Sequence, residues 1–213
     1  MTLENIVLLH AKAVDLATAG DNTAACEMFL RVIQEIRRSE LFKEETSVVR
    51  GIQNDDAVQV FPMNETMISK DEISMTLAAP LAVFVRGNRY DKVSPQGIVL
   101  FVVAALFNLG ASFHMSNGGV AKVKNAQHFY IKAINLLRTM PFSGSARPTL
   151  ALLGAVLCNN LAAIAADSFD CDACSHLLDG LALYLDGLEE PLQWLGFNII
   201  LWRGIKGQHA PSA

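Results

Sequence analysis

Helical periodicity constrains the fold of this chain more than any other feature. Apolar residues recur at steps of three and four through residues 3–19 and again through 22–39, as in amphipathic helices that bury one face. The polar turn Gly20–Asn22 separates the two runs, and Asp21 or Asn22 can cap the second helix by accepting its free N–H groups. Because this turn is so short, residues 1–39 are predicted to form an antiparallel helical hairpin.

The second half of the chain repeats this pattern. Ser94 and Pro95 are typical of an N-cap followed by a first-turn proline, and the helix that they open is predicted to run to about residue 115. We predict further helices at about 120–139, 148–167 and 171–186, which form hairpins over 94–140 and 148–187, and a short capping helix over 190–204.

Residues 40–93 interrupt the helical pattern. Residues 58–63 begin with strand-like alternation, and residues 81–85 are short, rich in strand formers and followed by Gly87 and Asn88. The two runs predict a small two-stranded antiparallel β-ribbon within a loop insert over 40–93. Since an isolated ribbon is only marginally stable, it must pack against the helices.

The three hairpins share a pattern of small and large apolar residues. Small residues let the two helices of a hairpin approach closely, and large ones fill the space to the neighbouring hairpin. The pattern comprises Leu9, Ala13, Leu16, Ala25, Phe29 and Val32 in the first hairpin, Leu106, Leu109, Gly110, Phe113, Ala126, Tyr130 and Ala133 in the second, and Cys158, Leu161, Ala162, Ala165, Cys174, Leu178 and Leu181 in the third.

These spacings, above all FNLGASFH (Phe107–His114) followed by AQHFYIKAINLLRTMP (Ala126–Pro141), resemble the tetratricopeptide-repeat family over about 120 of the 213 residues. The resemblance implies a mainly α fold in which antiparallel hairpins stack as a short TPR-like solenoid, in a single domain over 1–213. The sequence departs from the family at Lys12, where a leucine is usual. The second and third hairpins also repeat at roughly 50 residues instead of about 34. An ordinary helical bundle would show the same periodicity and remains the alternative.

In the resembled family, the first helix of each hairpin lines a concave groove that holds an extended peptide or a helix. The resemblance places on that groove His10, Val14, Phe107, Asn108, Ala111, His114, Asn159, Asn160 and Asp167. An asparagine amide can pair with the donor and the acceptor of a peptide backbone together. The alternative is that the three asparagines cap or bridge neighbouring helices inside the protein.

One activity of the family is not expected. Its chaperone-binding members grip a C-terminal carboxylate with cationic side chains, and charge-assisted bonds are the strong ones. The corresponding places in the first hairpin carry His10 and Val14, so the carboxylate would have no charged partner there.

Charge and hydropathy limit the partners. The net charge is −4 and Lys and Arg are scattered, so the chain offers no basic face for nucleic acid. The run Gly97–Met115 approaches the length of a membrane span of about 20 residues. Asn108 lies inside it and no positive cluster flanks it closely, so we expect a buried helix and no membrane contact. The N-terminal residues lack the features of a signal peptide, which favours an intracellular, cytoplasmic protein.

No motif predicts catalysis, a metal or a cofactor. Cys171 and Cys174 form a lone CxxC, and a structural zinc needs four ligands, for which only Cys158 and His176 are near in sequence. None of the five histidines belongs to an HExxH motif, and the glycines form no phosphate-binding loop.

The C-terminal segment offers a second site. Trp194, Phe197 and Trp202 lie in an apolar cluster that either caps the stack or forms a docking surface. We predict a non-catalytic adaptor or scaffold that binds a protein or peptide in the groove. The alternative is a structural subunit of a larger assembly, held by this C-terminal helix. The sequence leaves the oligomeric state open.

Overall fold

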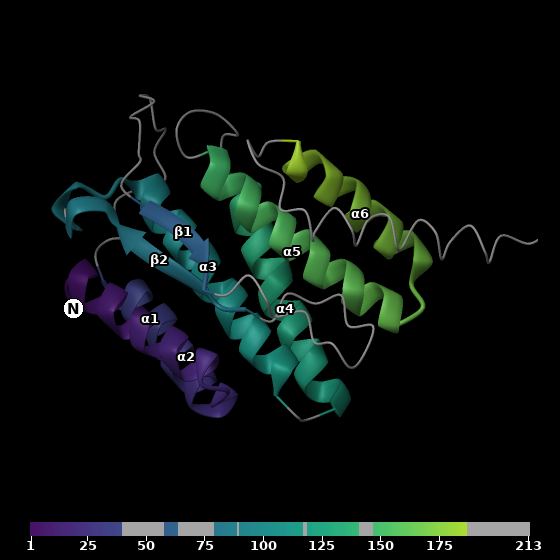
Figure 1. Ribbon diagram of the computed structural model, residues 1–213, viewed down its shortest axis with the longest axis horizontal. Helices are drawn as coiled ribbons and strands as arrows, with labels where there is room; N and C mark the ends of the chain where they lie inside the picture. The colour runs from purple at the N-terminus through teal and green to yellow at the C-terminus, as the bar shows by residue number, and fades with distance from the viewer. Residues whose placement is uncertain (40–57, 64–78, 89, 117–118, 141–146, 187–213) are drawn as a thin grey trace, which may run out of the picture.

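The computed structural model describes residues 1–39, 58–63, 79–88, 90–116, 119–140 and 147–186. Over these ranges the protein is mainly α-helical with one small antiparallel sheet, as predicted (Figure 1). The elements are α1 (Leu3–Thr18), α2 (Asn22–Arg38), β1 (Val58–Pro62), β2 (Leu81–Val85), α3 (Pro95–Met115), α4 (Gly119–Leu137), α5 (Arg147–Asp167) and α6 (Cys171–Leu185), with 3-10 turns at Arg86–Asn88 and Tyr90–Lys92. The predicted capping helix over 190–204, with Trp194, Phe197 and Trp202, lies outside the described residues.

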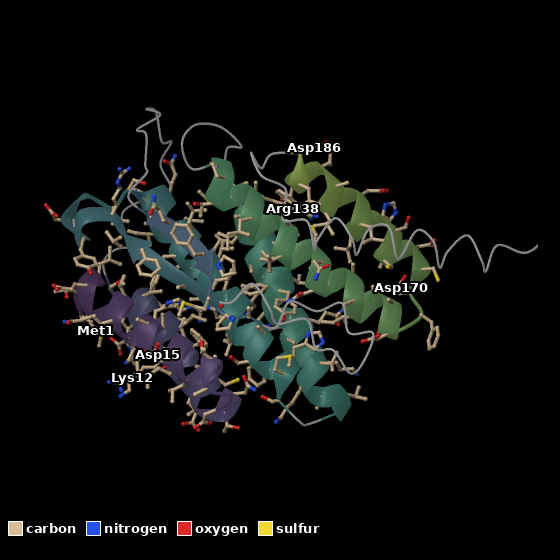
Figure 2. All side chains as sticks on the ribbon, viewed as in Figure 1. Met1, Lys12, Asp15, Arg138, Asp170 and Asp186 are labelled. Carbon is tan, nitrogen blue, oxygen red and sulfur yellow. The ribbon has the colours of Figure 1, made fainter. Side chains whose placement is uncertain are left out.

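Local capping sets where the helices begin. Thr2, Asp21, Ser94 and Asp170 each accept a hydrogen bond from the backbone N–H three residues further on, at the starts of α1, α2, α3 and α6. Gly20, with φ of 83°, supplies the left-handed backbone of the turn between α1 and α2. Lys12 and Asp15 are exposed and point away from the core of the protein (Figure 2).

Helices pack mainly against their neighbours in the chain. The main contacts join α1 to α2, α2 to α3, α3 to α4, α4 to α5 and α5 to α6, and lesser contacts join α1 to α3 and α3 to α5. The C-terminal ends of α1, α3 and α5 lie along one side of the molecule, next to the starts of α2, α4 and α6 (Figure 1). Because α3 packs against α1, α2, α4 and α5, and α5 against α3, α4 and α6, these two helices are the most enclosed.

The two central helices are unusually apolar. Pro95–Met115 and Pro148–Asp167 are long and apolar enough to cross a membrane by length and composition. In their most apolar windows, 78% and 83% of the residues are buried inside the protein, and a core helix of a soluble protein passes the same test. The length and hydropathy of these helices therefore do not assign either one to a membrane.

The β-ribbon covers part of α1 and α3, which agrees with the expectation that it leans on the helices. Its register pairs Val58 with Val85, Val60 with Val83 and Pro62 with Leu81, and the side chains of Val58, Val60, Leu81, Val83 and Val85 are buried. Phe61 and Phe84 point to the other side, where they are exposed with ring centroids 6.0 Å apart.

Two glycines lie where the helices of a hairpin cross most closely. A Cβ added to Gly110 on α3 would stand 2.6 Å from Cε1 of Tyr130 on α4, and one added to Gly154 on α5 would meet the ring of Tyr184 on α6. Tyr130 is fully buried, whereas Tyr184 is half-buried. A methyl group can therefore be accommodated at one crossing more easily than at the other.

We predict that Gly110→Ala lowers the free energy of unfolding by about 1–3 kcal/mol, because the enclosed Tyr130 ring cannot move aside. Gly154→Ala is the matched control. Both variants gain about 1 kcal/mol of helix propensity, and both require a ring to shift. Gly154→Ala should cost less, because the half-buried Tyr184 ring has more room to shift than the enclosed Tyr130 ring. Urea unfolding followed by circular dichroism measures both, and equal effects at the two sites would contradict the argument.

Candidate functional site

The residues predicted to line a groove come from α1, α3 and α5, and most of them lie inside the protein. His10, Val14, Phe107, Asn108, Ala111, Asn159 and Asn160 are buried, His114 is half-buried and Asp167 is exposed. The structure brings these residues into two polar groups, one around Asn108 and one around Tyr130. Val14 belongs to neither, since it packs with Ala13, Phe29 and Leu109 where α1, α2 and α3 meet.

Asn108 holds an extended strand by its backbone. Its Oδ1 accepts a hydrogen bond from the Leu81 N–H at 2.7 Å, and its Nδ2 donates to the Leu81 carbonyl at 2.8 Å. The same Nδ2 lies 3.1 Å from Nε2 of His10. Because an amide nitrogen only donates, Nε2 must accept, so we assign the His10 proton to Nδ1. Asn108 thus joins α3 to β2 and α1.

His10 is enclosed by aromatic rings in this first group. The centroid of its imidazole lies 5.4 Å from that of Phe29 and 5.1 Å from that of Phe101. Burial lowers the pKa of His10 to about 3. The ring is therefore neutral at physiological pH and acts as a hydrogen-bond acceptor for Asn108.

The second group is centred on the hydroxyl of Tyr130. Asn160 Nδ2 donates to that hydroxyl at 3.1 Å, and Asn159 Nδ2 donates to Oδ1 of Asn160 at 3.2 Å. The ring of Tyr130 also contacts those of Phe107 and His114, with centroids 5.7 and 6.2 Å apart. Burial raises the pKa of Tyr130 above its ordinary value, while the bond from Asn160 acts in the other direction.

His114 stands at the edge of this second group. Burial lowers its pKa, and the carboxylate of Asp167 opposes that shift. Its Nδ1 is buried and has no hydrogen-bond partner within the described ranges. The group therefore holds a neutral phenol, two amides and an imidazole, which can exchange hydrogen bonds but carry no activated nucleophile.

Tyr130 is the member of the site that the sequence analysis missed. Its place in the repeat pattern predicted only a large side chain that fills the space to the neighbouring hairpin. In the structure its ring lies against Gly110 of its own hairpin, and its hydroxyl reaches Asn160 on α5. A fully buried tyrosine generally finds a partner for its hydroxyl, and this was the signal that could have pointed to a polar neighbour.

For Asn108, the structure shows the internal alternative. Its amide pairs with a backbone donor and acceptor together, as predicted for peptide binding, but the strand that it holds is β2 of the same chain. That these side chains bind a separate partner remains a prediction.

None of the four cysteines, all of which the structure describes, forms a disulfide. Burial raises the pKa of Cys26 to about 11 and that of Cys158 to about 12, so both are protonated and unreactive at neutral pH. Cys171 is exposed and Cys174 is buried. Among the residues that the structure describes, no three His, Cys, Asp or Glu side chains lie close enough together to hold a metal ion.

Comparison with protein-family models, with curated proteins and with solved structures finds no match to this chain. The resemblance to tetratricopeptide repeats therefore remains a prediction from the sequence.

We predict that Asn108→Ala lowers the free energy of unfolding by about 2–4 kcal/mol, because it leaves the buried N–H and C=O of Leu81 without partners. Asn135→Ala, at an exposed position of α4, is the control and should change stability by less than about 0.5 kcal/mol. Denaturant unfolding measures the difference, and hydrogen exchange at the Leu81 amide should accelerate only in the first variant. Unchanged protection of that amide would show that Asn108 does not hold β2.

The neutral state of His10 predicts a stability that depends on pH. Its pKa is about 3 in the folded protein and about 6.5 when unfolded, so below about 6.5 the unfolded chain binds a proton that the fold excludes. The contribution of His10 is complete above that pH and declines by roughly 1.4 kcal/mol per pH unit as the pH falls toward 3.

The variant His10→Gln tests this dependence, because glutamine can accept the bond from Asn108 without titrating. Its free energy of unfolding should fall less steeply than that of the natural protein between pH 6.5 and pH 3. Carboxylates and His114 contribute equally to both proteins, so parallel profiles would refute the assignment.

Proposed function

We propose that this protein is a non-catalytic, intracellular adaptor or scaffold, built as a short TPR-like solenoid, that binds a protein partner through an extended segment. The observation that carries the proposal is the bidentate bond between Asn108 and the backbone of Leu81. The sequential packing of α1 to α6 supports the solenoid, since each helix of a solenoid contacts mainly its neighbours.

The contacts of β2 indicate what such a segment would need. Its backbone would pair with the amide of Asn108, and side chains at alternate positions would enter the apolar space that Leu81, Val83 and Val85 occupy. Main-chain hydrogen bonds give affinity in this mode of binding, and alternate side-chain pockets give specificity. The partner is therefore expected to present an apolar strand and to compete with β2 for the face formed by α1 and α3.

The position of Asn160 is a second feature that supports the proposed solenoid. Asn160 on α5 corresponds to Asn108 on α3, because the repeat pattern aligns Ala162 with Gly110. Both asparagines are buried, and both donate from Nδ2 to an oxygen of a neighbouring element. The same position on successive hairpins thus carries a buried amide that bonds to the element packed against it, which supports a repeated arrangement of the hairpins.

Affinity purification from the native cell tests the proposal, with the natural protein, Asn108→Ala and Asn135→Ala as baits. A recurrent partner that is retained by the Asn135 variant and lost by a folded Asn108 variant would support it. A synthetic peptide of residues 79–86 should compete with that partner, whereas a scrambled peptide should not. Capture that is equal for all three folded baits would refute binding at this face.

A further inference from the structure

Charges are segregated between two neighbouring stretches of the chain. Residues 119–140, which contain α4, carry Lys122, Lys124, Lys132 and Arg138 and no acidic residue. Residues 148–186, which contain most of α5 and all of α6, carry Asp167, Asp170, Asp172, Asp179 and Asp186 and no lysine or arginine. A surface on one stretch is therefore complementary in charge to a surface on the other.

Among the residues that the structure describes, Phe169 is the most exposed large apolar side chain. It lies in the turn between α5 and α6, is 90% exposed, and has φ of 56°, in the left-handed region that bulky side chains rarely adopt. The exposed carboxylates Asp167, Asp170 and Asp172 surround it in sequence, and Figure 2 shows Asp170 at the margin of the molecule. The turn thus presents an aromatic ring within an acidic border.

The exposed face of α4 has the opposite character. Val120, Lys124, His128 and Ile131 follow one another at steps of four, four and three, so they form one stripe along the helix, and all four are exposed. Val120 is 71% and Ile131 42% exposed, and Lys132 lies beside the stripe. This face combines apolar side chains with positive charge.

We infer that two copies of this protein associate through these surfaces, with Phe169 of each copy packed on the α4 stripe of the other. The aspartates around Phe169 then face Lys124 and Lys132. The turn and the start of α4 lie along the same side of the molecule (Figure 1), so one two-fold axis can form both contacts at once. The surfaces differ from the face that holds β2, so this inference does not rest on the proposed function.

Light scattering after size exclusion tests the association. At about 0.1 mM protein and about 0.05 M NaCl, the mass should approach twice 23.1 kDa, and raising the salt to about 0.5 M should shift it toward the monomer.

Phe169→Gly should weaken the dimer at least about tenfold. Its melting temperature as a monomer should rise, because glycine adopts this φ without strain. Leu183→Ala, at another exposed apolar site, is the control and should not weaken the dimer.

A charge exchange identifies the two surfaces. The double variant Asp167→Lys, Asp172→Lys makes the turn net positive opposite the lysines of α4 and keeps the N-cap Asp170. The double variant Lys124→Glu, Lys132→Glu places carboxylates opposite the acidic turn, so each protein alone should be monomeric. Mixed together, the two should form a dimer, because both contacts are then again between opposite charges.

A monomer under all conditions would overturn the inference, and so would a dimer that survives the separate charge variants. Loss of the dimer in each variant without recovery on mixing would show that the turn does not pair with α4, and would also overturn the inference.

Discussion

The burial of α3 is the constraint on which the rest of the structure depends. The helix is apolar around its whole circumference, so no single neighbour can remove it from water. Within the described residues, α2 and α4 are its main helical neighbours, and α1, α5 and both strands of the ribbon complete its surroundings. The ribbon and the helix therefore depend on each other. Two strands are only marginally stable alone, and α3 without the ribbon would expose apolar surface.

Asn108 determines how these two elements fit together. It is a polar group in an apolar helix, and burying an unpaired amide would cost several kcal/mol, about 2–7 depending on the reference state. Leu81 and His10 provide the required partners from different elements. A shift of β2 by one residue would break these bonds and also turn its buried valines outward. The packing of α3 supplies stability, and Asn108 makes one register of the ribbon far more favourable than the others.

The helices and strands could be predicted from the sequence because their signals are local. Asp21 and Ser94 cap the helices that follow them. Alternation at the start of residues 58–63 and the run of strand formers over 81–85 mark the two strands. The partners inside the candidate site could not be predicted in this way. Asn108 bonds to a residue 27 positions away and Asn160 to one 30 positions away, and such pairs depend on how the helices pack. The resemblance to tetratricopeptide repeats placed both asparagines on a groove, with an internal role as the alternative, and gave no information on which residues of this chain would meet them.

Phe169 raises the opposite question, because its side chain is left exposed by the residues that the structure describes. Its backbone conformation costs about 1–2 kcal/mol for a residue with a side chain, and glycine, as at the equivalent turn at Gly20, would avoid that cost. The exposed ring contributes almost no burial to the isolated fold. Burying a phenylalanine side chain against another surface stabilises by about 1.5–3 kcal/mol, which is enough to offset the backbone term. The strain at this turn is thus compensated only when the ring is covered, and a second copy, with its cationic and apolar stripe on α4, offers a surface of the right chemistry to cover it.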